Sequence, residues 1–450
     1  MSFHGLPNEL LAKIIQHVPN LSQLARCNTH LYDIVTPVLY REVSGSEGHD
    51  LARFLRTILR CPMLGQRVRR FCTGQGGYVF CLWTWTPVDF QLCEESLVGR
   101  ISRADTEDYI QGVQYGLWDA ICALLIRVLP NLTTLELCPY PYGFRRIMEL
   151  FPEIATFKER DEETSPADGT VANTLARINR SGSVMPHSCL HNLKHVKAFF
   201  DIRNYLNHEA VMRLCCLNTA HIELLGFPPD HEAGFRRDGP PLSTRRMTLS
   251  GPRLPTEYVL ELLGRFPGLE HFEYFHCDAL PKTLGVALSC SKYTLKTLVI
   301  SPALMYPHSV DGIGSLSEFE NLVYLSINAC SLFGLSVDPV GSDTYPLVRN
   351  ICDILPPGLQ YFHLGDCTEI LFRQLLNFAL RRKTVVPSMK HLELVVISTY
   401  GVDFGHCAEG RPPLLFPWDA WDDAGAAVDV VSAFQAEGVQ TTLRWKWEIG

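Results

Sequence analysis

The sequence has 450 residues, of which 46% are hydrophobic and 20% are charged, so the chain can bury a large core and is not disordered as a whole. Forty Lys and Arg residues against 48 Asp and Glu residues give a net charge of −8, which argues against a general affinity for nucleic-acid phosphate. No apolar run approaches the ~20 residues of a membrane-spanning helix, and the first residues lack the basic region of a signal peptide. We therefore expect a cytoplasmic or nuclear protein, without membrane or nucleic-acid partners, whose thiols stay reduced.

The first forty residues predict three short helices. In the first helix, apolar residues recur at helical spacing between Pro7, which suits a first helical turn, and Pro19, which ends the helix. A second helix carries Leu21 and Leu24, and a third is expected to end at Thr36, because the proline that follows disfavours a helical residue before it. Three helices this short cannot bury all their apolar side chains against one another, so we expect the surplus to contact a neighbouring domain or a partner.

Residues 6 to 43 resemble an F-box, and the closing residues are most similar to the fungal branch of that family. The positions that carry the resemblance are Leu6, Pro7, Glu9, Leu10, Leu11, Ile14, Ile15, Val18, Pro19, Leu21, Leu24, Cys27 and the run from Pro37 to Glu42. Two departures are mild: an Asn-Leu pair stands where Asp-Leu is common, and Tyr40 replaces the usual late Trp.

The resemblance implies that this segment docks on the Skp-type linker protein of a cullin–RING ubiquitin ligase. The docking residues that it implies are Leu6, Pro7, Leu10, Leu11, Ile14, Ile15, Leu21 and Leu24. The alternative interpretation is an amphipathic cap that only closes the end of a larger solenoid domain, as repeat proteins require.

A short apolar pattern recurs through the rest of the chain. The clearest copies begin at residues 132, 193, 269, 295, 322, 359 and 389, with apolar residues at the first, fourth and sixth positions, and weaker copies begin at 219 and 244. Successive copies from 193 to 322 lie 25 to 27 residues apart. A period of about 20–29 residues with this pattern is the leucine-rich-repeat signature.

One strand and one helix per repeat predict an α/β fold: an N-terminal three-helix F-box, then an irregular leucine-rich-repeat solenoid with a curved parallel sheet inside and helices outside. The alternative is a closed α/β barrel, whose strands would be apolar on both faces. Polar residues alternate with the apolar ones, as in Lys194, His195 and Lys197, so the open solenoid is favoured. The predicted domains are residues 1–43 and 44–450, with insertions at about 74–115 and 156–188.

The C-terminal half predicts several further elements. Helices are expected over residues 256–266, 345–355, 369–382 and about 419–436, and a closing strand is expected around residues 443–449. The cysteines that occupy the Asn or Cys position of the repeat, and that we expect to be buried and unbridged, are Cys277, Cys330 and Cys367.

Templates for catalysis and for metal binding are incomplete. We find no phosphate-binding loop, zinc-protease helix or hydrolase elbow, so we expect no enzyme activity and no cofactor. The sequence has no CxxC pair, and His187, Cys189 and His191 are not followed by a second ligand pair, so we expect no metal site.

The polar strand positions of a solenoid line its concave face, where extended binding surfaces lie. The predicted substrate-binding residues are Lys194, His195, Lys197, Arg245, Arg246, Glu270, His271, Glu273, Tyr324, Tyr361, His363 and His391. We expect a basic patch between Lys194 and Arg246 to give way to a mixed, aromatic surface.

Together, the F-box resemblance and the repeats predict a substrate-recognition subunit of an SCF-type ubiquitin ligase. Its expected partners are the Skp-type linker, a cullin bound through that linker, and a protein substrate held on the repeat domain. The alternative is a leucine-rich-repeat scaffold for protein–protein interactions outside ubiquitination.

Overall fold

The computed structural model describes residues 6–15, 17–45, 48–73, 85–97, 103–114, 118–138, 192–199, 219–226, 241–250, 256–277, 281–302, 312–334, 350–367, 369–399 and 420–448. The chain divides into two compact units, Met1–Gly226 and Phe227–Gly450. The domain boundary predicted at residue 43 lies within the first unit. Across these described residues, no helix combines the length and the apolar character that crossing a membrane requires.

The first unit begins with helices α1 (Asn8–Ile15), α2 (Leu21–Ala25) and α3 (Thr29–Leu39). Asn20 and Asn28 cap α2 and α3: their side-chain oxygens accept hydrogen bonds from the backbone N–H groups of Gln23 and Leu31. The core of the three helices is formed by Ile15, Ala25 and Val35, with Leu21, Leu24, Ile34, Val38 and Leu39 packed against it.

The third helix does not end at Thr36, as the sequence predicts, but continues through Pro37 to Leu39. Pro37 lies in the last turn, where its missing N–H removes a single intrahelical hydrogen bond. The Tyr40 N–H still donates to the carbonyl of Thr36 at 3.0 Å, and Val38 packs on the core. Burial of the apolar side chains after the proline therefore outweighs its local preference.

Among the described residues of the first unit, five further helices follow. They are α4 (Gly48–Arg60), α5 (Pro62–Gly65), α6 (Pro87–Leu97), α7 (Arg103–Gln114) and α8 (Trp118–Val128). Helices α6 and α7 lie within the insertion predicted at about 74–115. Helix α8 is buried along its length, from Ala120 to Ile126, which explains why this stretch is apolar all round.

A buried carboxylate ties the insertion to α4. Asp89 of α6 accepts hydrogen bonds from the backbone N–H and the hydroxyl of Thr86, and its carboxylate lies 2.8 Å from Arg60 and 3.3 Å from Arg56. Burial by itself would raise the pKa of Asp89, but the hydrogen bonds from Thr86 and Arg60 outweigh it and hold the pKa below its ordinary value. The insertion is thus anchored by a fully paired charge.

The strands of the first unit form a parallel sheet in chain order. They are β1 (Glu42–Ser44), β2 (Arg70–Cys72), β3 (Thr134–Leu137), β4 (His195–Phe199) and β5 (His221–Leu225). Each strand pairs with the next, and Phe71, Leu135, Val196 and Ile222 follow one another in register. Strand β1 is not predicted by the apolar pattern, and it joins the end of the F-box-like segment directly to the sheet.

The second unit repeats this arrangement with longer strands. They are β6 (Arg246–Ser250), β7 (His271–Cys277), β8 (Thr297–Pro302), β9 (Tyr324–Asn328), β10 (Tyr361–Cys367), β11 (His391–Thr399) and β12 (Gln440–Glu448). Each strand again pairs in parallel with the next, and the β11–β12 ladder extends over nine residue pairs from His391 to Thr399.

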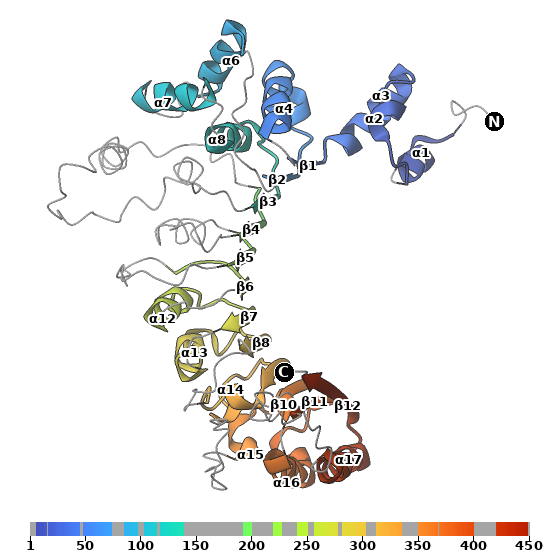
Figure 1. Ribbon diagram of the computed structural model, residues 1–450, viewed down its shortest axis with the longest axis vertical. Helices are drawn as coiled ribbons and strands as arrows, with labels where there is room; N and C mark the ends of the chain where they lie inside the picture. The colour runs from blue at the N-terminus through green and yellow to red at the C-terminus, as the bar shows by residue number, and fades with distance from the viewer. Residues whose placement is uncertain are drawn as a thin grey trace, which may run out of the picture. The chain divides into compact units, whose positions relative to one another are not determined.

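Helices alternate with the strands of the second unit. They are α12 (Thr256–Gly264), α13 (Pro281–Leu288), the short 3₁₀ helix η3 (Ser289–Ser291), α14 (Ala329–Phe333), α15 (Ile351–Ile354), α16 (Glu369–Val385) and α17 (Ala420–Ala436). Figure 1 shows α12 and α13 on the same side of strands β7 and β8. The helices predicted over 256–266, 369–382 and 419–436 are confirmed to within a few residues.

The apolar positions of the repeat pattern form the core. In β7, the buried Phe272 and Tyr274 alternate with the half-exposed His271 and Glu273, and β3, β4 and β5 alternate in the same way. Within each unit the first and last strands do not pair with one another among the described residues, so neither sheet closes into a barrel. The chain is therefore an α/β protein with an open parallel sheet, consistent with a solenoid. The predicted insertion at 156–188 and the group His187, Cys189 and His191 lie outside the described residues.

Candidate functional site

Two surfaces correspond to the binding residues predicted from the sequence: one side of helix α1, and the polar face of the parallel sheets. We define the polar face as the strand side chains that alternate with the buried ones.

On α1, the eight predicted docking residues divide by burial. Leu10 and Ile14 are 47% and 42% exposed, and they are four residues apart, so they lie on the same side of the helix. Leu11 and Ile15 are each only 1% exposed. The structure thus corrects the prediction that these two residues dock on a partner: their side chains are buried in the core of this unit.

The remaining predicted docking residues lie between these extremes. Pro7 is exposed, and Leu6, Leu21 and Leu24 are half-buried. Tyr32 on α3 is an exposed aromatic residue that the sequence analysis did not select. Its position four residues after the N-cap Asn28 predicts a helix but does not predict exposure of the side chain.

In the first unit, the polar face of β4 and β5 holds a compact charged cluster. His195 lies in register with His221, and their rings stack with centroids 4.3 Å apart. Glu223 lies 3.1 Å from His195 Nε2 and 3.3 Å from Lys197 Nζ. Lys194 precedes the strand and is exposed. The positive charge expected in this region is therefore partly compensated by a carboxylate.

His221 and Glu223 are not among the predicted site residues, although a signal for them exists. The repeat step from 195 to 221 is 26 residues, which is the spacing that brings neighbouring repeats into register. Aligning the copies by this step would have placed His221 beside His195 and Glu223 beside Lys197.

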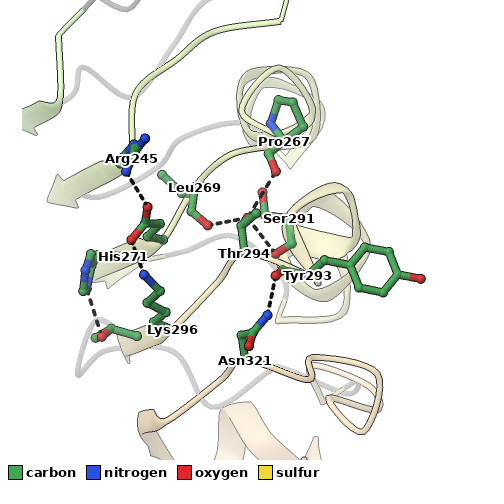
Figure 2. A network of polar contacts seen from close by, with 11 residues as sticks. Arg245, Pro267, Leu269, His271, Ser291, Tyr293, Thr294, Lys296 and Asn321 are labelled. Atoms are coloured by element: carbon green, nitrogen blue, oxygen red, sulfur yellow. Dashed lines mark hydrogen bonds and ion pairs between the residues drawn. The ribbon is translucent and has the colours of Figure 1, made fainter.

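In the second unit, a carboxylate also compensates part of the expected positive charge. Glu270 lies 2.6 Å from Lys296 Nζ and 3.1 Å from Arg245 Nη1. Figure 2 shows Arg245 and Lys296 approaching this shared carboxylate from two neighbouring repeats. The hydrogen bond from Lys296 holds the pKa of Glu270 below its ordinary value. Arg245 and Lys296 therefore share one carboxylate, which compensates part of the positive charge expected here.

His271 and His363 illustrate a second recurring contact. The Nδ1 atom of His271 lies 3.0 Å from Thr297 Oγ1, and that of His363 lies 2.8 Å from Ser326 Oγ, each on the neighbouring strand. Burial lowers the pKa of both imidazoles, because it disfavours the charged form. These histidines are thus held neutral by the sheet, with cross-strand hydroxyl partners that orient their rings.

The turns that lead into the strands are fixed by side-chain hydrogen bonds between repeats. Thr294 donates to the backbone carbonyls of Leu269 and Pro267, and the Asn321 side chain donates to the carbonyl of Tyr293 at 2.6 Å (Figure 2). Because these contacts lie before β8 and β9, they set the register of the polar face without occupying it.

An aromatic patch covers the polar face from β9 to β11. We define it as Tyr324, Tyr361 and His391, which follow one another in register. The ring centroids of Tyr361 and His391 are 4.6 Å apart in a parallel stack, and those of Tyr324 and Tyr361 are 6.4 Å apart. Both tyrosines are exposed. Tyrosines of this kind frequently anchor protein interfaces.

The remaining predicted residues, Arg246 and Glu273, lie on the same face at one register position each in β6 and β7. Glu273 accepts a hydrogen bond from Thr248 at 3.3 Å. The predicted residues therefore lie on the polar face of the sheet in each unit and divide into separate groups: the His195 cluster in one unit, and the Glu270 ion pairs and the aromatic patch in the other.

Of the three cysteines expected to be buried, Cys367 is buried and Cys330 is half-buried, and neither forms a disulfide. Burial raises the pKa of the Cys330 thiol to about 11 and also raises that of Cys367. The side chain of Cys277 lies outside the described residues.

A comparison of the sequence with models of known protein families gave no match, and a comparison with curated proteins gave none.

Proposed function

We propose that this protein is the substrate-recognition subunit of an SCF-type ubiquitin ligase. In this proposal, residues 6 to 41 dock on a Skp-type linker protein, which joins them to a cullin. The polar face of the repeat domain holds a protein substrate. The chain performs no bond chemistry itself, and it acts by raising the effective concentration of substrate lysines near the charged ubiquitin carrier.

The observation that carries the proposal is the exposure of Leu10 and Ile14 on α1. Two large apolar side chains on consecutive turns of an eight-residue helix leave an apolar surface in water. Covering such a surface is favourable by about 25 cal/mol per Å². The same segment carries the F-box-like motif, and the adjoining side of the helix, at Leu11 and Ile15, is already covered.

Support for substrate binding comes from the aromatic patch of Tyr324, Tyr361 and His391. The patch lies on an open sheet, and Tyr324 and Tyr361 are 38% and 39% exposed, so a partner can reach both rings. Stacked rings need little further ordering when a partner binds, so such a patch favours association.

Co-purification with the linker protein tests the docking step. The wild-type chain is expected to retain the linker, and Leu10→Asp and Ile14→Asp are each expected to lose it. Both substitutions are at exposed positions, so folding is expected to survive. Leu380→Asp is the matched control, because Leu380 on α16 is 80% exposed and lies outside the motif.

Two results would reject the docking proposal: wild-type protein that does not bind the linker, or retention by both variants. A second step tests the ligase assignment. The linker-bound complex is expected to recruit a cullin, and its failure to do so would favour a repeat scaffold that acts outside ubiquitination.

A further inference from the structure

Three potential metal ligands converge on the polar face of the first unit. His195 on β4 and His221 and Glu223 on β5 each offer one ligand atom, and these atoms all lie within 4.8 Å of one another. The Glu223 Oε1 atom lies 3.1 Å from His195 Nε2 and 3.5 Å from His221 Nε2. The three side chains come from two neighbouring strands whose backbones are held in register.

These separations match those between ligands on a tetrahedral metal. Zinc binds histidine nitrogen and carboxylate oxygen at about 2.0–2.2 Å, which places neighbouring ligand atoms roughly 3.3–3.5 Å apart. The strand spacing of about 4.8 Å keeps the two histidines within reach of one ion. The carboxylate therefore already lies at ligand distance from both imidazoles.

The state of His195 indicates that its hydrogen bonding is incomplete. Its Nε2 atom is shielded from solvent and makes no hydrogen bond, although Glu223 lies 3.1 Å away. A shielded nitrogen without a hydrogen bond is costly in a folded protein, whereas coordination to a metal would satisfy it. Lys197 contacts the other carboxylate oxygen at 3.3 Å, so Oε1 is left to face the histidines.

We propose that His195, His221 and Glu223 form a three-ligand site for Zn²⁺ or another borderline divalent transition metal. Two imidazoles and one carboxylate suit these ions, whereas Mg²⁺ and Ca²⁺ prefer oxygen ligands alone. The three side chains are partly exposed, so a fourth position is open to water or to a ligand donated by a partner.

Metal binding requires a local rearrangement. The two rings are parallel to within 4°, so their nitrogen lone pairs do not yet point at a common centre. The proposal therefore requires the two imidazole rings to rotate out of the stack, and both residues are only partly buried. A histidine coordinates a metal ion through a neutral imidazole nitrogen.

The proposal does not depend on ubiquitination, and titration of the full chain with Zn²⁺ tests it directly. The protein should carry no histidine tag, be treated with a chelator, and be kept reduced. Calorimetry compares wild type with His221→Ala and with the isosteric Glu223→Gln. His271→Ala is the matched control, because His271 also lies on the polar face and belongs to the other unit.

Thiol sites contribute equally in all four proteins, so the difference between them isolates this cluster. We expect both ligand variants to bind one fewer Zn²⁺ ion, or to bind it about 100-fold more weakly, while the control matches wild type. Circular dichroism should show unchanged folding of Glu223→Gln. Zinc binding that is the same in wild type, His221→Ala and Glu223→Gln would overturn the proposal.

Discussion

Helix α13 contains a glycine whose replacement by alanine should destabilise the second unit. A Cβ atom added at Gly285 would overlap the backbone carbonyl oxygen of Ile313 and would lie 3.1 Å from its carbonyl carbon. This obstacle is backbone, which cannot move aside as a flexible side chain can. The close approach of α13 to the segment before β9 therefore requires glycine.

The expected magnitude follows from two opposing effects. Overpacking against a fixed group costs about 3 kcal/mol at the upper end of its usual range, and the higher helix propensity of alanine returns about 1 kcal/mol. Gly285→Ala should thus destabilise the fold by about 2 kcal/mol. Gly425 in α17 has no atom within 4 Å of such a Cβ and is exposed, so Gly425→Ala should stabilise the fold by up to about 1 kcal/mol.

Urea unfolding of the full chain, followed by the circular dichroism signal of its helices, measures both changes as shifts of the midpoint. Thermal unfolding provides a second measure, with about 2–4 °C expected per kcal/mol for a unit of this size. The two substitutions are chemically identical, so their opposite signs isolate the contact with Ile313. Equal stabilisation by both would refute the packing of α13 described above.

Three further outcomes can be measured. Ile15→Ala should destabilise the N-terminal helices by about 2–4 kcal/mol, whereas Ile14→Ala should change their stability by less than about 0.5 kcal/mol. Hydrogen exchange of residues 8–39 distinguishes the two variants. Similar exchange in both would contradict the burial of Ile15 and the exposure of Ile14. Because burial lowers the pKa of His363, this side chain binds a proton less well in the folded state than in the unfolded state, so stability should fall as pH drops through about 6.5. His363→Asn should make stability depend less on pH in this range. An unchanged dependence would show that other groups cause it. Alkylation of the native protein should modify the exposed Cys27 and spare the buried Cys367, and rapid loss of the Cys367 thiol would show that its strand opens.

Strand positions could be predicted from the sequence because their signal is local and repeated. An apolar residue at each of three fixed positions specifies a short strand, and the copies confirm one another, as at Leu325 and Phe362. Strand β1 gave no such signal: it has a single half-buried residue, Val43, and pairs only because β2 lies beside it. Its formation depends on a neighbour that is distant in sequence.

Burial within the N-terminal helices was harder to predict. The stripe of α1 is wide enough to supply both an inner and an outer side, and the spacing alone does not tell which pair of residues faces the core. Contact with Ala25 and Val35 decides this in favour of Ile15. The continuation of α3 through Pro37 has the same origin, since tertiary packing overrides a local preference.

Charge on the sheet was the least predictable feature. The sequence predicts a basic patch between Lys194 and Arg246. The carboxylates that pair with Lys197 and Arg245, however, come from the next repeat along the chain. Such pairing depends on the register between repeats rather than on the order of residues within one repeat. The cluster of His195 with the neighbouring strand was missed for the same reason.

The in-register polar positions of the sheet also bear on how this surface can evolve. Within each unit, every strand adds one side chain to each row, as Tyr324, Tyr361 and His391 do in theirs. A duplicated or deleted repeat would therefore lengthen or shorten a row by one position and leave the neighbouring positions as they were. The specificity of such a surface can therefore change by substitution of one polar residue at a time, without altering the packing of the buried side chains of each strand.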